Sequence, residues 1–213
     1  MAPMDRSQRR IAFVTTTGVG FLGAVALAAR ALRPRGDDSS PLPGDDLVSG
    51  ATIVETHQID IDAPAATIWP WLVQLGYGRG GFYSFDLLER LAGVGMTNAR
   101  RIEPQWQDLA VGDQVRLAAD AALVVARLEP ERCLVLSSDG GAAPPGAGMD
   151  FDFSWAFVLD EPGGLGSGGC RLRIRERYRP RRGATTAVVR AMRPVARLMT
   201  YGMMWGLRRR CRA

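Results

Sequence analysis

The segment that decides the fold is Ile59–Arg90, IDIDAPAATIWPWLVQLGYGRGGFYSFDLLER, which joins a strand to two short helices. Asp62 stands where the first helix is expected to begin, and its carboxylate can accept the free amide protons of the first turn. Pro64 suits that turn because the N–H that proline lacks would have no partner there. The apolar residues between Ile68 and Leu75 give this helix a face to bury.

A glycine-rich aromatic loop, residues 76–84, follows the first helix, and Ser84 is expected to cap the second one. The run Gly76–Gly81 matches neither GxxxxGK[ST] nor GxGxxG after a strand, so it is not interpreted as a phosphate site. Its glycines are expected instead to let the chain bend sharply above packed aromatic side chains. Arg79 in this loop could meet an anionic ligand group at the mouth of a cavity.

The sequence before this segment divides into a hydrophobic terminus and a linker. Residues 36–50 contain four aspartates punctuated by proline and glycine, which is typical of a polar linker. Residues 52–61 alternate and are rich in β-branched side chains, which predicts the first strand. We therefore expect three parts: residues 1–35, the linker 36–50, and one folded domain over residues 51–213.

Ile11–Ala29 is a run of 19 residues without a charge. As a helix it would span about 28 Å, close to the ~30 Å hydrocarbon thickness of a bilayer. We interpret it as an uncleaved single-pass membrane anchor, whose orientation the arginines on both sides leave open. Two alternatives stay open. Arg9-Arg10 resembles a twin-arginine export signal, which would be cleaved to leave an exported protein, and the run could also be a soluble helix.

After Met96 the pattern changes to short extended runs separated by turns. Strands are expected over residues 101–106, 114–117, 122–128, 133–138, 150–159 and 170–178. The fifth run places four aromatic side chains on one face: Phe151, Phe153, Trp155 and Phe157. The sixth alternates arginine with apolar residues, which predicts a strand with one face in water.

Residues 185–212 are predicted to form a long C-terminal helix, which Pro194 is expected to kink or divide. Its apolar residues recur at three- and four-residue steps: Val188, Met192, Val195, Met199, Met203 and Leu207. One strand, two short helices, several antiparallel strands and a long helix predict an α+β fold, a curved antiparallel sheet wrapped around the C-terminal helix. Such an arrangement tends to leave a cavity between sheet and helix, with the methionines as an adaptable wall.

The net charge of +5 is distributed unevenly. Residues 171–213 hold 14 arginines and one acid, for a net +13, and residues 1–35 hold six arginines and one acid, for a net +5. The body, residues 36–170, therefore carries a net −13. Because the basic ends accompany a hydrophobic terminus, anionic lipid is a simpler partner for them than nucleic acid. A plain solvated helix end is the alternative for the C-terminal tail.

No catalytic constellation is visible, and neither a metal nor a cofactor is predicted. His57, the only histidine, is interpreted as structural or surface-exposed rather than as a general base. Asp86 and Glu89 lie one helical turn apart, but no histidine remains to complete a metal set with them, so they are interpreted as a solvated face. The three cysteines form no CxxC unit: Cys133, Cys170 and Cys211.

The order of elements resembles the helix-grip fold of the START-like proteins, also called the SRPBCC or polyketide cyclase/dehydrase and lipid-transport superfamily. Five segments are similar to an actinobacterial subgroup in which an N-terminal hydrophobic segment is common: PLPGDDLV (41–48), IDIDAP (59–64), IWPWLVQLGYGRGGFYSFDLLE (68–89), PQWQDLAVGD (104–113) and SWAFVL (154–159). The resemblance covers about residues 41–212. It implies a cavity for a hydrophobic small molecule or lipid beneath the C-terminal helix and carries over no reaction.

These observations predict a membrane-anchored protein that binds a hydrophobic small molecule or lipid. The candidate cavity residues are Tyr77, Arg79, Phe82, Tyr83, Trp106, Trp155, Phe157, Met192 and Met199. One rival is a cyclase- or dehydratase-type enzyme acting on a polyketide-like substrate, with Tyr83, Asp86 or Arg79 polarising a carbonyl. Another is a scaffold whose cavity is filled by its own side chains. An enzyme needs polar groups that converge in the cavity, a carrier needs an empty apolar cavity, and a scaffold needs almost none.

Overall fold

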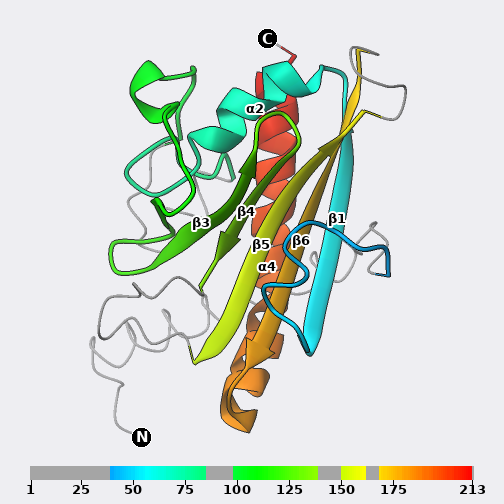
Figure 1. Cartoon of the computed structure of the whole chain (residues 1–213), viewed down its shortest axis with the longest axis vertical. Coiled ribbons are helices and arrows are strands. Elements are labelled where there is room, and N and C mark those ends of the chain that lie inside the picture. Colours follow the sequence, from blue (N-terminus) through cyan, green and yellow to red (C-terminus); the bar gives the residue numbers. More distant parts are fainter. Residues whose placement is uncertain (1–38, 85–97, 139–149, 162–167, 213) are drawn as a thin grey trace, which may run out of the picture.

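The computed structural model describes residues 39–84, 98–138, 150–161 and 168–212. One face of a six-stranded sheet is covered by the long C-terminal helix, and a short helix crosses one end of the sheet (Figure 1). All neighbouring strands are antiparallel, in the order β1-β6-β5-β4-β3-β2. This confirms the predicted α+β helix-grip class. The expected N-terminal hydrophobic helix and the second short helix lie outside the described residues.

Apart from residues 101–106, the described elements follow the expected order. The strands are β1 (Ile53–Ile61), β2 (Gln114–Arg116), β3 (Ala122–Glu129), β4 (Cys133–Ser137), β5 (Phe151–Asp160) and β6 (Cys170–Pro180). The helices are α2 (Ala65–Val73), α4 (Gly183–Arg210) and a single 3-10 turn, Pro104–Trp106. Within the described ranges, no helix has the length and apolar character needed to cross a bilayer.

The main core fills the space between the inner face of the sheet, α2 and the last turns of α4. Side chains alternate across each strand, so Ile61 of β1, Leu172 of β6 and Phe157 of β5 all point to this side. Met203 and Leu207 of α4 complete the core and are fully buried. The sheet and the C-terminal half of α4 therefore form one packed unit.

Two local predictions are wrong. The cap of α2 is Pro64, not Asp62, and no side chain caps it from within the segment. The helix begins later than expected, which leaves Asp62 outside the capping position and exposed to solvent. The amide of Ala65 instead donates to Oε1 of Glu161 at 2.8 Å. A residue after β5 thus satisfies the first turn of α2.

The strand expected over residues 101–106 is also absent, and the 3-10 turn takes its place. Pro104 begins that turn, and it cannot donate to a sheet ladder. The backbone around it bonds instead to the side chain of Gln74, which donates to the carbonyl of Arg101 at 3.2 Å and accepts from the amide of Glu103 at 3.0 Å.

Helix α4 runs through Pro194 without dividing. The predicted apolar stripe is buried only in the second half of the helix. Val188 and Met192, in the first half, are 61% and 54% exposed. The first half of α4 lies over cavities rather than over packed side chains.

Residues 39–50, which we call the strap, pack across part of the outer face of the sheet. Leu42 of the strap is buried in an outer cluster with Val135 of β4 and Val158 of β5. In Figure 1 the strap crosses the face of the sheet opposite α4. The segment that composition describes as a linker is therefore packed against the domain, and the middle of the arginine face of β6 lies beneath it.

Candidate functional site

The candidate site is a cavity of about 310 Å³ between the inner face of the sheet and α4. The sheet contributes four aromatic side chains to its wall: Phe151, Phe153, Trp155 and Tyr178. Helix α4 contributes Ala196, Met199, Thr200 and Met203. Phe82, Ser84, Leu117 and Glu176 complete the lining. Apolar atoms make up almost all of the wall.

The aromatic side of the cavity follows from the two-residue period of β5 and from its register with β6. Phe153 lies opposite Tyr178 in the ladder, and their ring centroids are 4.6 Å apart. Phe82, from the loop after α2, approaches Trp155 at 5.8 Å. Aromatic rings packed against one another form a rigid wall, whereas the methionines on α4 can adopt several shapes. One side of the cavity is therefore fixed and the other adaptable.

One charged residue, Glu176 of β6, belongs to the wall and is only 4% exposed. Its Oε1 accepts a hydrogen bond from the hydroxyl of Thr200 at 2.7 Å, and its Oε2 accepts one from the hydroxyl of Tyr178 at 2.7 Å. Burial and the Glu176 carboxylate raise the pKa of Tyr178 well above its ordinary value. The phenol of Tyr178 therefore stays protonated and serves as a donor to this acid.

A second cavity of about 140 Å³ adjoins the first and shares Glu176, Tyr178, Phe151 and Ala196 with it. Its remaining lining comes from Glu55 of β1 and from the first half of α4: Val188, Val189, Met192 and Arg193. The exposed Val188 and Met192 thus border this smaller cavity. Together the two cavities follow the underside of α4 from Val188 to Met203.

A buried ionic cluster holds α4 to β1 beside the second cavity. Glu55, which is 2% exposed, accepts from Arg197 at 2.8 and 3.0 Å and also from Arg193. Nε2 of His57 lies 3.5 Å from Oε2 of Glu55. Burial alone would raise the pKa of Glu55, but the hydrogen bonds from Arg197 and Arg193 and the neighbouring His57 outweigh it and lower that pKa to about 2. Glu55 is therefore an anion held by cations of the helix.

This shift predicts how acid affects the stability of the fold. Because the pKa of Glu55 in the folded state lies below its ordinary value of 4.5, the contribution of Glu55 to stability is complete above about pH 4.5. It is lost as the pH falls through about 2. In Glu55→Gln the free energy of unfolding is expected to fall less steeply than in wild type as the pH is lowered from about 4.5 to about 2. Urea unfolding at a series of pH values measures it. The hairpin variant Glu129→Gln, at a side chain that is 45% exposed, is the control and should keep the wild-type slope. Equal slopes for Glu55→Gln and wild type would contradict this role of Glu55.

Three of the residues predicted from the sequence line the main cavity: Phe82, Trp155 and Met199. Met192 lines the second cavity instead. Phe157 is fully buried in the core, with its ring centroid 4.8 Å from that of Trp155. It supports the cavity wall without forming part of it.

The other four predicted residues lie outside the cavities. Arg79 donates to the carbonyls of Trp106 at 2.8 Å and Val73 at 3.3 Å, and so ties the aromatic loop to the 3-10 turn and α2. The hydroxyl of Tyr83 donates to the carbonyl of Trp71 at 2.9 Å. The ring of Tyr77 lies beneath the guanidinium of Arg116 at 5.3 Å.

These contacts bear on the enzyme alternative, which assigned a carbonyl-polarising role to Tyr83, Asp86 or Arg79. The side chains of Tyr83 and Arg79 are both engaged with backbone carbonyls away from the cavity wall. Asp86, like its neighbour Glu89, lies outside the described residues. His57 is wholly buried against α4, with its ring 5.3 Å from that of Tyr201.

Sequence reasoning missed Glu176, Tyr178 and Thr200 as cavity residues. The sequence did contain a signal for Glu176. It is the one acid on the face of β6 that also carries Leu172, Ile174 and Tyr178. The period of β5 also places Phe151 and Phe153 beside Trp155. Across the described ranges, no group of three or more histidine, cysteine or acidic side chains is arranged to hold a metal ion.

No protein-family model matches this sequence, and no curated protein matches it either. Among solved structures, the chain is similar to protein MLL2253 from Mesorhizobium loti, with 19% identity over 74% of this chain and 96% of that one and a TM-score of 0.41. It is similar to CalU16 from Micromonospora echinospora, with 15% identity over 75% and 83% of the two chains and a TM-score of 0.34. It is also similar to truncated norcoclaurine synthase from Thalictrum flavum, with 13% identity over 76% and 94% and a TM-score of 0.43. At these values the similarities assign neither an activity nor a ligand.

Proposed function

We propose that this protein binds a small hydrophobic molecule, a lipid or a polyketide-like compound, in the cavity between the sheet and α4. The observation that carries the proposal is the cavity of about 310 Å³ with an almost wholly apolar wall. Ligand pockets in proteins range from about 300 to 1,000 Å³, so a ligand at the small end of that range fits. Each Å² of apolar ligand surface removed from water contributes about 25 cal/mol.

The cavity supports binding ahead of the two rivals. A scaffold would fill this space with its own side chains, whereas Met199 and Met203 leave it open toward the aromatic wall. A cyclase or dehydratase needs polar groups that converge on the substrate. The wall provides one acid, Glu176, and both of its oxygens already accept hydrogen bonds from the protein.

We further propose that residues 11–29 hold the domain at a membrane as a single-pass anchor. The support is the 19-residue uncharged run, whose length as a helix matches a bilayer. The side of the membrane is open, and export after cleavage of this segment is the alternative. A membrane location would place the cavity close to a store of apolar ligands.

A cavity-filling variant tests the binding proposal. Ala196 lines both cavities, and Ala196→Phe is expected to occupy part of the space. Loss of about 60 Å² of ligand contact corresponds to about 1.5 kcal/mol, which is about a tenfold rise in the Kd for a fluorescent fatty acid. The measurement is a fluorescence titration of the full-length chain.

The matched control is Ala187→Phe, an exposed position on the same helix. Both variants replace alanine by phenylalanine in α4, so their intrinsic helix penalties are similar. The control is expected to keep the wild-type Kd, and thermal melting checks that both variants fold. Equal Kd values for wild type and Ala196→Phe would place the ligand outside this cavity and contradict the proposal.

A further inference from the structure

The last turns of α4 have two faces of opposite character. Thr200, Met203 and Leu207 face the core and are buried. Trp205 is 58% exposed, and a helix places Arg208 and Arg209, three and four residues later, on the same face as Trp205. Arg212, in the turn that ends the helix, is also exposed.

The tryptophan and one arginine of this exposed face are in contact. The guanidinium carbon of Arg208 lies 5.0 Å from the centroid of the Trp205 ring. A stacked pair of this kind exposes an apolar ring next to a fixed positive charge. No ion pair joins Arg208, Arg209 or Arg212 to an acid in the part of the chain that the structure describes.

A loop distant in sequence lies at the same end of the molecule. Nε of Arg210 donates to the carbonyl of Ala99 at 2.9 Å, and its guanidinium lies over the ring of Tyr83 at 4.6 Å. These contacts hold the backbone of Ala99 against the end of α4. We call Trp205, Arg208, Arg209 and Arg212 the terminal patch.

We propose that the terminal patch docks on a membrane surface that contains anionic lipid head groups. Tryptophan concentrates at the membrane–water interface, where the ring is apolar and its N–H is wet. Arginines beside it are attracted to the negative surface potential of anionic lipid. The surface therefore matches the interfacial zone of such a membrane in both chemistry and charge.

Nucleic acid is the competing partner, since an exposed tryptophan between arginines can also stack on a base. The charge of the chain favours the membrane. The body of the protein, residues 36–170, carries a net −13, which would repel a polyanion extending beyond the patch. A membrane surface is flat, so it contacts only the terminal patch that faces it and not the acidic body.

The test uses the full-length chain with two kinds of vesicle, one of neutral phosphatidylcholine and one with added anionic phosphatidylglycerol. Lipids brominated on their acyl chains quench the fluorescence of tryptophan that reaches the interface. Comparison of wild type with Trp205→Phe isolates the signal of Trp205. We expect Trp205 to be quenched in anionic vesicles and not in neutral ones.

Charge removal provides the second arm. Each arginine near an anionic surface contributes about fivefold, so Arg208→Gln with Arg209→Gln is expected to lower the ratio of docked to undocked patch about 25-fold. The matched control removes two arginines at the other end of α4, Arg182→Gln with Arg190→Gln, and should leave quenching unchanged. Melting curves confirm that each variant folds.

Three outcomes would overturn the proposal. The first is the absence of Trp205-specific quenching in anionic vesicles, and the second is equal quenching in neutral and anionic vesicles. The third is salt-sensitive binding of a single-stranded oligonucleotide that requires Arg208 and Arg209 while the vesicles leave Trp205 unquenched. That last result would assign the terminal patch to nucleic acid.

Discussion

Gly206→Ala is expected to destabilise the protein by about 3 kcal/mol or more, because overpacking a closed contact forces the backbone to shift. A Cβ at position 206 would stand 2.0 Å from the carbonyl oxygen of Tyr83 and 2.9 Å from its Cβ. Helix α4 thus crosses the backbone of the aromatic loop at the one point where a glycine lets it approach. Displacing the helix would also open the core beneath Met203 and Leu207.

Tyr83 has little freedom to move away from the new methyl group. Its amide donates to Oδ1 of Asn98 at 2.6 Å, and its hydroxyl donates to the carbonyl of Trp71. Its backbone also has a φ of 56°, a left-handed conformation that costs energy for a residue with a side chain. Helix α4 must therefore move away from Tyr83 instead.

A second glycine on the same helix is the matched control for this prediction. A Cβ at Gly183 would meet no atom within 4 Å. Gly183→Ala is expected to leave stability unchanged or to raise it by up to about 1 kcal/mol, through helix propensity alone. Urea unfolding monitored by far-UV circular dichroism measures both variants. Equal midpoints for the two would show that α4 does not approach Tyr83 as closely as described.

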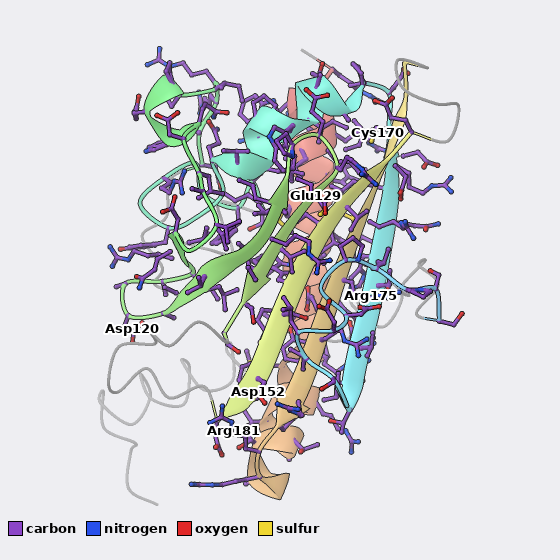
Figure 2. The ribbon with its side chains drawn as sticks, in the orientation of Figure 1. Asp120, Glu129, Asp152, Cys170, Arg175 and Arg181 are labelled. Carbon is purple, nitrogen blue, oxygen red and sulfur yellow. The ribbon has the colours of Figure 1, made fainter. Side chains whose placement is uncertain are left out.

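Arg175→Ala is expected to cost about 3 kcal/mol, because it removes one partner from a buried network of charges and hydrogen bonds. The residue is 1% exposed, on the outer face of β6. Its guanidinium donates to Oδ2 of Asp45 at 2.7 Å, to the hydroxyl of Thr56 at 2.8 Å and to the carbonyl of Ser40 at 2.8 Å. Figure 2 shows Arg175 where the strap crosses the sheet.

The expected structural consequence is release of the strap, residues 39–50. Hydrogen exchange should become faster at Leu42 to Val48 in Arg175→Ala, while the sheet keeps its protection. Arg171→Ala is the control, since the pair of Arg171 with Asp60 on the same strand face is solvent-exposed and worth 0–1 kcal/mol. If the two variants lost the same stability and exchanged alike, the strap would not be held by Arg175.

The strands could be predicted because alternation is local. Each run of β-branched and aromatic residues near β3 to β6 carries its own period, and the structure has a strand at each of them. The cap of α2 and the packing of the strap could not be predicted in this way. Glu161 lies 96 residues from Ala65, and Asp45 lies 130 residues from Arg175, so neither contact is present in a local pattern.

The candidate site was predictable where it depends on strand period and helix spacing, as for Trp155 and Met199. It was not predictable in the aromatic loop, where the backbone decides which rings reach the cavity. Phe82 lines the cavity, while its neighbour Tyr83, held with positive φ, directs its hydroxyl to Trp71. Adjacent aromatic residues in such a loop give no sign of which one faces the ligand.

The measurement that tests ligand binding most directly is native mass spectrometry of the full-length chain purified from a bacterial host, followed by organic extraction of any bound species. We predict a co-purifying apolar molecule at near-stoichiometric yield, lost or diminished in Ala196→Phe and retained in Ala187→Phe. Contradiction would be a protein that emerges empty and also takes up no fluorescent fatty acid.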